Sequence, residues 1–245
     1  MSDKIEGRNP VAEALRSGRQ IDKIYVKRGE KQGSIIPIIR QAKKQGIIVS
    51  EVDTERLNEM SETKNHQGVI ALVSPVEYAD IDDVLELARR KDEPPFIVIL
   101  DRINDPHNLG SIIRTANCAG VHGVVIPRHD SVTVTATVEK AAAGATAYTP
   151  VVRAANLAKT IDYLKDNGVW VTGADAAGDR SLFEADLKGG VAIVVGSEGE
   201  GISRLVAEKC DFLVKIPMKG DINSLNASVA AALMIYECAK QRNTF

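Results

Sequence analysis

Aromatic residues and cysteines are scarce in this chain, and their scarcity excludes several kinds of site. Only 4% of the 245 residues are aromatic, so platforms on which nucleic-acid bases stack are not expected. The three cysteines, Cys118, Cys210 and Cys238, are widely spaced, and the four histidines show no metal-ligand spacing. The sequence therefore predicts neither a disulfide framework nor a metal site.

Long apolar runs are missing as well. No stretch approaches the roughly 18 apolar residues of a membrane span, and the charged start Met1-Ser-Asp-Lys4 lacks the apolar segment of a signal peptide. Hydrophobic residues make up 44% of the chain and charged residues 26%, which is ordinary for a soluble globular protein. We therefore expect a cytoplasmic protein with no membrane partner.

Neither sign of charge dominates, since the net charge is −2, but the charges are unevenly distributed. Residues 1–73 contain 13 lysines and arginines against 10 carboxylates, whereas residues 74–95 contain 3 against 7. Residues 96–245 are nearly balanced, with 15 against 16. The basic excess of the first segment could hold phosphates, although a solvated surface would have the same composition.

The first 95 residues show two kinds of pattern. Residues 1–73 alternate helical and strand-like segments and form a compact α/β unit, in which Asn9 is the expected N-cap and Pro10 the first helical residue. Residues 74–95 are acidic and bracketed by prolines, which favours a linker around one helix. The expected helices span 9–15, 35–45, 54–60 and 81–90, and the expected strands 21–27, 47–52 and 68–73.

From residue 96 to residue 245, strand and helix patterns alternate. Continuous valine and isoleucine runs indicate strands buried on both faces, and hence a parallel sheet covered by helices. The expected strands span 96–100, 122–126, 148–152, 169–173, 191–195 and 212–216, and the helices 110–119, 134–143, 157–167, 203–209 and 227–241.

Three polar loops each follow a hydrophobic run. They are Asn108-Leu-Gly-Ser-Ile-Ile-Arg114-Thr115, Gly196-Ser-Glu198-Gly-Glu-Gly201, and Ile216-Pro-Met218 with Ser224-Leu-Asn226-Ala-Ser228. Because ligand sites in open α/β sheets form at the carboxyl ends of strands, these loops predict one composite site.

The second loop lacks both glycine-rich fingerprints of phosphate-binding loops and carries Glu198 and Glu200. A phosphate cradle requires bare amide groups and positive potential, so two glutamates disfavour it. S-adenosylmethionine fits such a loop, because it combines a nucleoside and an amino acid with a positive sulfonium. A glycine-rich turn with solvated glutamates is the alternative.

The other two loops also allow more than one interpretation. Asn108 could simply cap the following helix, and Ser224 or Asn226 could cap the last one. Arg114 could bind a phosphate through both branches of its guanidinium, or lie free on the surface. Of the histidines, only His107 is near the expected site.

Taken together, the motifs N-x-G-x-x-x-R-T, G-x-E-G-x-G and I-P-M with S-L-N-x-S resemble those of the SpoU/TrmH methyltransferases of the SPOUT superfamily, in order and in spacing. The resemblance covers the whole chain. Residues 1–73, with the turn His66-Gln67-Gly68, resemble the small L30e-like substrate-binding domain of rRNA-type members. The first loop is most similar to that of the enzymes that methylate a guanosine 2′-hydroxyl in 23S rRNA.

This resemblance implies more than the residue pattern does. It implies a SPOUT-type catalytic domain over 96–245 with a C-terminal trefoil knot, a homodimer, and S-adenosylmethionine as the methyl donor. It assigns catalysis to Arg114, Asn108, Glu198, Ser224 and Asn226, and cofactor binding to Gly196, Ile216 and Leu225.

Five alternatives remain open at this stage. Within the family, the target could be a guanosine in tRNA, a different nucleotide in rRNA, or an adenosine in rRNA. The chain could also be a non-catalytic RNA-binding protein on the same scaffold, which the presence of Asn108, Arg114, Glu198 and Asn226 disfavours. A nicotinamide-dependent oxidoreductase is disfavoured by the missing dinucleotide fingerprint.

Overall fold

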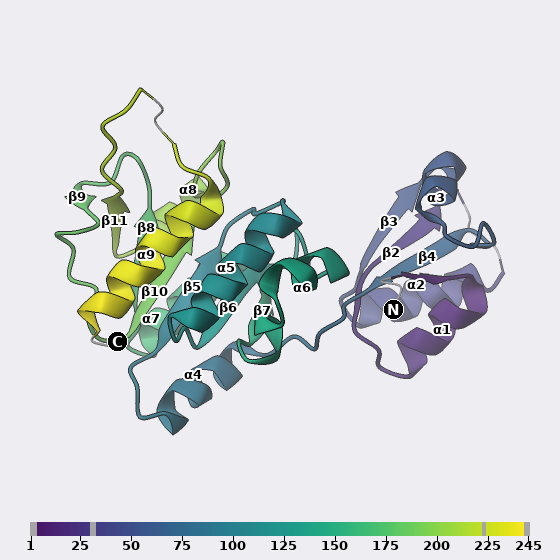
Figure 1. Cartoon of the computed structure of the whole chain (residues 1–245). Coiled ribbons are helices and arrows are strands. Elements are labelled where there is room, and N and C mark those ends of the chain that lie inside the picture. Colours follow the sequence, from purple (N-terminus) through teal and green to yellow (C-terminus); the bar gives the residue numbers. More distant parts are fainter. Residues whose placement is uncertain (1–3, 30–32, 222–223, 243–245) are drawn as a thin grey trace. The chain divides into compact units, whose positions relative to one another are not determined.

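The computed structural model describes residues 4–29, 33–221 and 224–242 and divides the chain into two compact units, Met1–Glu77 and Tyr78–Phe245. Figure 1 shows the elements of both units. No helix in the described ranges is long and apolar enough to cross a membrane.

The first unit is a four-stranded sheet with helices. The strands lie in the order β1-β4-β2-β3; β4 is antiparallel to β1 and β2, whereas β2 and β3 are parallel. Side chains such as Val11, Ile24, Ile38 and Val69 form its core. Its elements are β1 Lys4–Glu6, α1 Arg8–Arg16, β2 Ile21–Lys27, α2 Ile35–Lys44, β3 Ile48–Val52, α3 Thr54–Met60 and β4 Val69–Val73.

The start of α1 differs from the prediction that Asn9 is its N-cap. The helix begins at Arg8, with Gly7 as the N-cap at φ 91°. The backbone N–H of Arg8 donates to Oε1 of Gln67 at 3.1 Å. The first N–H group of the helix is therefore satisfied by a side chain 59 residues away, which no local pattern in the sequence indicates.

The second unit contains a seven-stranded sheet in the order β7-β6-β5-β10-β8-β11-β9, and all of its strand pairs are parallel, as predicted. Its helices are α4 Ile81–Arg90, α5 Pro106–Cys118, α6 Ala136–Ala142, α7 Leu157–Asp166, α8 Arg204–Lys209 and α9 Ala227–Gln241, with a 3-10 turn at Ala145–Ala147. Its strands are β5 Phe96–Leu100, β6 Gly123–Pro127, β7 Val151–Ala154, β8 Trp170–Ala174, β9 Arg180–Ser181, β10 Val191–Val195 and β11 Phe212–Lys215.

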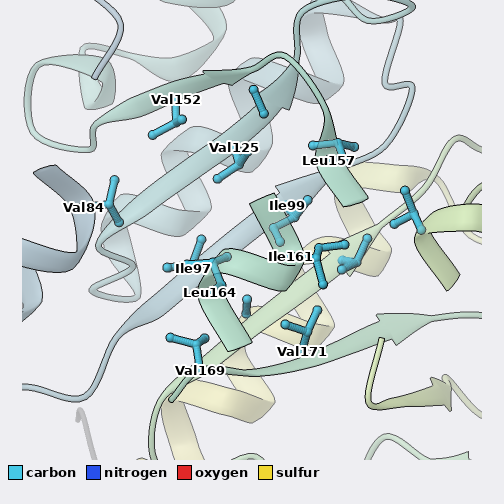
Figure 2. Close-up of a cluster of buried hydrophobic side chains, with 14 of the residues drawn as sticks. Val84, Ile97, Ile99, Val125, Val152, Leu157, Ile161, Leu164, Val169 and Val171 are labelled. Carbon is cyan, nitrogen blue, oxygen red and sulfur yellow. The ribbon is translucent and has the colours of Figure 1, made fainter. Parts of the chain in front are cut away.

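Helices cover both faces of this sheet. On one face, α5 and α9 lie side by side (Figure 1). On the other face, Leu157 and Ile161 of α7 pack against strand residues such as Ile99 and Val125 (Figure 2). Val84 of α4 belongs to the same cluster, and a Cβ on Gly123 would lie 2.5 Å from its Cγ2. The helix expected inside a linker is therefore part of the second unit's core.

The strand order explains why distant loops meet. The chain runs outward from β5 through β6 to β7, and then crosses to β8 on the other side. Strand β10 lies between β5 and β8. The carboxyl ends of β5, β8, β10 and β11 consequently share one edge of the sheet, at the point where the strand order reverses.

Candidate active site

A cavity of ≈ 490 Å³ lies at this edge, within the range of small-molecule sites. The segments after β8, β10 and β11 form its wall. Gly196, Ile216 and Leu225, for which the family resemblance implies cofactor binding, all line it, as do Glu198 and Ser224. Other lining residues include Ala174, Asp175, Glu200, Met218 and Ala230.

The glycine-rich loop Gly196–Gly201 closes on itself. Ser197 and Gly201 exchange two backbone hydrogen bonds of 3.1 and 2.9 Å. A Cβ on Gly196 would lie 2.0 Å from the carbonyl carbon of Gly201, a distance that no side chain tolerates. Gly196 is therefore required for this loop to close beneath the cavity.

Three residues from the three predicted loops meet at one carboxylate. Oε1 of Glu198 accepts from Nδ2 of Asn108 at 2.8 Å and from Nδ2 of Asn226 at 2.6 Å. Nδ2 of Asn226 also lies 3.0 Å from Oδ1 of Asn108. The sequence predicted a composite site, and the structure brings these three together; we refer to them as the Asn108–Glu198–Asn226 cluster.

The two asparagines hold different positions in their helices. Asn108 is 8% exposed and lies inside α5, so it is not the N-cap that the sequence allowed. Asp105 caps α5, accepting from the N–H of His107 at 2.8 Å, because an aspartate directly before a proline is a strong start signal. Asn226 does cap α9, where its Oδ1 accepts from Ser228 N–H at 2.9 Å.

Two residues at the end of β5 also hold the glycine-rich loop, and sequence reasoning missed them. The buried Asp101 accepts from the N–H of Ser203 at 2.7 Å through Oδ2. Arg102, at φ 60°, forms an ion pair with Glu200. An acidic and a basic residue directly after a buried strand were the only signal in the sequence, and they belong to no motif.

Arg114 stands apart from the Asn108–Glu198–Asn226 cluster. Its side chain is exposed on α5 and makes no hydrogen bond or ion pair with any residue in the described ranges. It lies six positions after Asn108, so the two side chains leave the helix about 120° apart and roughly 9 Å along its axis. The guanidinium therefore projects from a different face of α5.

The charged residues that line the cavity are all acidic. They are Asp175, Glu198 and Glu200, and no lysine, arginine or histidine of the described residues lines it. Nor do the described residues include a group of three or more histidine, cysteine, aspartate or glutamate side chains that could hold a metal ion. The cavity therefore favours a ligand with positive charge and disfavours phosphate.

Two family models match this chain. The SpoU rRNA Methylase family matches residues 95–236, and RNA 2′-O ribose methyltransferase substrate binding matches residues 4–79. A Staphylococcus aureus (strain MSSA476) protein named as a TrmH family tRNA/rRNA methyltransferase is 52% identical over 241 residues, covering 98% of this chain and 96% of its own. The chain belongs to the SpoU rRNA methylase family and is an RNA methyltransferase.

Solved structures share the fold. The SpoU methyltransferase AviRb from Streptomyces viridochromogenes, in complex with the cofactor AdoMet, matches with a TM-score of 0.62 and 24% identity, over 98% of this chain and 90% of that chain. An AdoMet-bound rRNA methyltransferase from Sinorhizobium meliloti matches with a TM-score of 0.61 and 25% identity, over 97% and 86%. The predicted α/β class, with a parallel sheet and a small preceding domain, is confirmed.

Proposed function

We propose that this protein transfers the methyl group of S-adenosylmethionine to the 2′-hydroxyl of a guanosine in 23S rRNA. The observation that carries the proposal is the acidic cavity, which the predicted second and third loops line. S-adenosylmethionine supplies a methyl group already activated on a positive sulfur, and it contains no phosphate that Glu198 and Glu200 would repel.

The residues that would hold this cofactor are Gly196, Ile216 and Leu225, because they line the cavity from two of its three walls. Gly196 lets the loop close on Gly201, which fixes the backbone that a ligand in the cavity would contact. The carboxylate of Asp175, which also lines the cavity, adds negative charge for the sulfonium or the ammonium of the methionine part.

The chain's own groups must place the ribose hydroxyl in line with the methyl group and help remove its proton. We assign the Asn108–Glu198–Asn226 cluster and Ser224 to orienting the ribose. Arg114 would bind the adjacent phosphate and stabilise the developing alkoxide, since a guanidinium stays charged and cannot serve readily as a base. Its lack of a partner within the described residues leaves both branches available for such a contact.

The N-terminal unit supports an RNA substrate, because the substrate-binding family model covers residues 4–79. We propose residues 1–73 as the RNA-gripping part, and rRNA as the substrate class. We also propose the guanosine of 23S rRNA and the trefoil knot on the basis of the motif resemblance, and a cytoplasmic location on the basis of the composition.

We further propose a homodimer. Val229, Leu233 and Tyr236 are 47%, 37% and 44% exposed, and their spacing of three and four residues places them on one face of α9. An apolar stripe of this kind is typical of a contact surface. Because α9 begins beside Asn226, a second copy bound here would lie close to the cluster.

The decisive experiment is transfer of a tritiated methyl group to unmodified 23S rRNA and unmodified tRNA, followed by mapping of the labelled nucleotide. We expect label on a guanosine ribose of 23S rRNA. Label confined to tRNA, or to an adenosine of rRNA, would replace the proposed substrate by one of the alternatives. Absence of transfer to either RNA would refute 23S rRNA as the substrate of this methyltransferase.

A further inference from the structure

The N-terminal unit contains a second cavity, of ≈ 410 Å³, lined by Arg8, Lys27, Thr54, His66, Gln67 and Gly68; we call it the Arg8–Lys27 cavity. Its two charged lining residues are cations, and no carboxylate of the described residues lines it. Its electrostatic character is therefore the opposite of that of the acidic cavity in the second unit.

The wall of the Arg8–Lys27 cavity is a strained turn clamped to the start of α1. Gln67 and Gly68 both have positive φ, 51° and 81°. Arg8 holds Gln67 twice, because its backbone N–H donates to Oε1 at 3.1 Å and its Nε donates to the backbone oxygen at 3.0 Å. A non-glycine residue in this conformation costs about 1–3 kcal/mol, and such strain concentrates at functional sites.

His66 holds the turn through both of its ring nitrogens. Its Nδ1 accepts from the N–H of Gly68 at 3.0 Å, and its Nε2 lies 3.0 Å from Oδ1 of Asn58. The side chain is buried, at 8% exposure, and it fixes the turn that forms this wall of the cavity.

We propose that the Arg8–Lys27 cavity binds a phosphodiester of the RNA backbone. Lys27 offers an exposed cation and Thr54 a hydroxyl, and Arg8 adds the positive charge of a guanidinium that is held at the turn. No aromatic side chain of the described residues lines the cavity, so it grips the backbone rather than stacking on a base. The methyl donor, which is positive, would be repelled.

This inference rests on the proposed function, because the RNA is the substrate of that function. It adds that the cavities of the two units carry charges of opposite sign. RNA phosphates are repelled by the acidic cavity of the second unit and are attracted to the Arg8–Lys27 cavity of the first. Contacts with phosphates position a nucleic acid without reading its sequence, so this site contributes affinity and leaves the choice of nucleotide to other residues.

The test uses the full-length protein and in vitro transcribed 23S rRNA, with binding measured by filter retention at several salt concentrations. Lys27 is exposed, so Lys27→Ala and Lys27→Glu leave the core intact. We expect the dissociation constant to rise roughly fivefold and more than tenfold, respectively. We also expect the slope of log affinity against log salt to fall by about 1 for Lys27→Ala, as for the loss of one phosphate contact.

The matched control is Lys43→Ala, a change to an exposed lysine of α2 in the same unit that does not line the cavity. Its affinity and salt slope should stay at the wild-type values. The Lys27→Glu variant should bind an unrelated RNA of equal length more weakly than the wild type does, and by the same factor as for 23S rRNA.

Two results would overturn the proposal: wild-type affinity and salt slope in Lys27→Glu, or a loss of affinity confined to 23S rRNA, which would indicate base recognition. Because the readout is binding, it is independent of catalysis. If wild-type protein binds RNA through this cavity but transfers no methyl group, the proposed function fails and the phosphate site stands.

Discussion

Asn108 and Glu198 are 90 residues apart in the chain, and Nδ2 of Asn108 donates a 2.8 Å hydrogen bond to Oε1 of Glu198. Asn226 donates to the same oxygen at 2.6 Å, so one carboxylate oxygen joins the loops that follow β5, β10 and β11. The loops are therefore held as one piece, although each comes from a different part of the sequence.

Glu198→Ala should destabilise the second unit, because it leaves the Nδ2 group of the buried Asn108 without an acceptor. We expect a loss of about 1–2 kcal/mol in the free energy of unfolding, measured with urea. Glu198→Gln, which keeps an acceptor oxygen, should lose less. Glu184→Ala, at an exposed position of the same unit outside the cluster and the cavity, is the control, and a loss as large as that of Glu198→Ala would contradict the role of the cluster.

Arg114→Ala should abolish methyl transfer without affecting folding, because the side chain is exposed and has no partner in the described ranges. We expect kcat to fall by roughly 10²–10³, the usual effect of removing one group that stabilises developing charge. Arg114→Lys should recover little, since an ammonium cannot bind a phosphate through two branches. Steady-state kinetics and thermal unfolding measure the two effects, and an Arg114→Lys variant with most of its activity would rule out two-branched binding.

Asp175→Asn should weaken the binding of S-adenosylmethionine and spare that of S-adenosylhomocysteine, which lacks the positive sulfur. Oδ1 of Asp175 accepts from the N–H of Ala177 at 2.8 Å, and asparagine can keep this bond, so the change removes charge alone. We expect a three- to tenfold rise in the dissociation constant of S-adenosylmethionine by calorimetry, the size of a partly screened charge interaction. Asp179→Asn, outside the cavity, is the control, and an equal effect on both ligands would disprove selection by charge.

Leu233→Glu should dissociate the proposed homodimer, because a carboxylate would be buried in the apolar stripe of α9. We expect the sedimentation coefficient to change from that of a dimer to that of a monomer. Leu205→Glu is a suitable control, since Leu205 is 54% exposed on α8, outside the stripe. If Leu233→Glu sediments like the wild type, the stripe of α9 is not the dimer surface.

Acidification should destabilise the fold through His122. Burial lowers the pKa of His122 below its ordinary value of 6.5, and the nearby Glu93 carboxylate opposes this only in part. Its Nδ1 accepts from the N–H of Phe96 at 3.0 Å, a bond that requires the unprotonated nitrogen. The unfolded chain therefore takes up the proton first, and stability declines as the pH falls from about 6.5 toward the lower pKa of the folded state.

Urea unfolding at pH 7.5 and pH 5.5, in the wild type and in His122→Asn, isolates this contribution. We expect the wild type to lose more stability between the two pH values than the variant does. Equal losses would show that His122 is not responsible for the decline.

Local patterns predicted most of the elements, and the failures have identifiable physical reasons. Strands β5 and β10 have the predicted bounds, because continuous β-branched runs mark them from end to end. Strand β1 was not predicted, since three residues, Lys4–Glu6, show no period and are stabilised by pairing with β4. The start of α5 was placed too late because Asn108 was considered as a cap, whereas Asp105 caps the helix.

The candidate site was also predictable in part. Motif spacing identified Asn108, Glu198 and Asn226, and the structure places them within hydrogen-bonding distance. Asp101 and Arg102 were missed, because their role depends on the glycine-rich loop crossing over the end of β5, which no spacing encodes. The roles that the motifs suggest for Arg114 and Ser224 remain predictions for kinetics to test.

The sequence by itself determined which chemical groups the loops carry. The loop after β10 carries glycines and carboxylates, and the loops after β5 and β11 carry the amide groups of Asn108 and Asn226. The sequence also determined which segments are buried strands, because periodicity is local. Only the tertiary structure decided which groups meet. Strand β10 lies between β5 and β8, and that strand order brings Glu198 to Asn108 and Asn226. This strand order depends on long-range packing. No local pattern can predict it, since every buried strand offers its neighbours a similar hydrophobic surface and similar backbone hydrogen bonds.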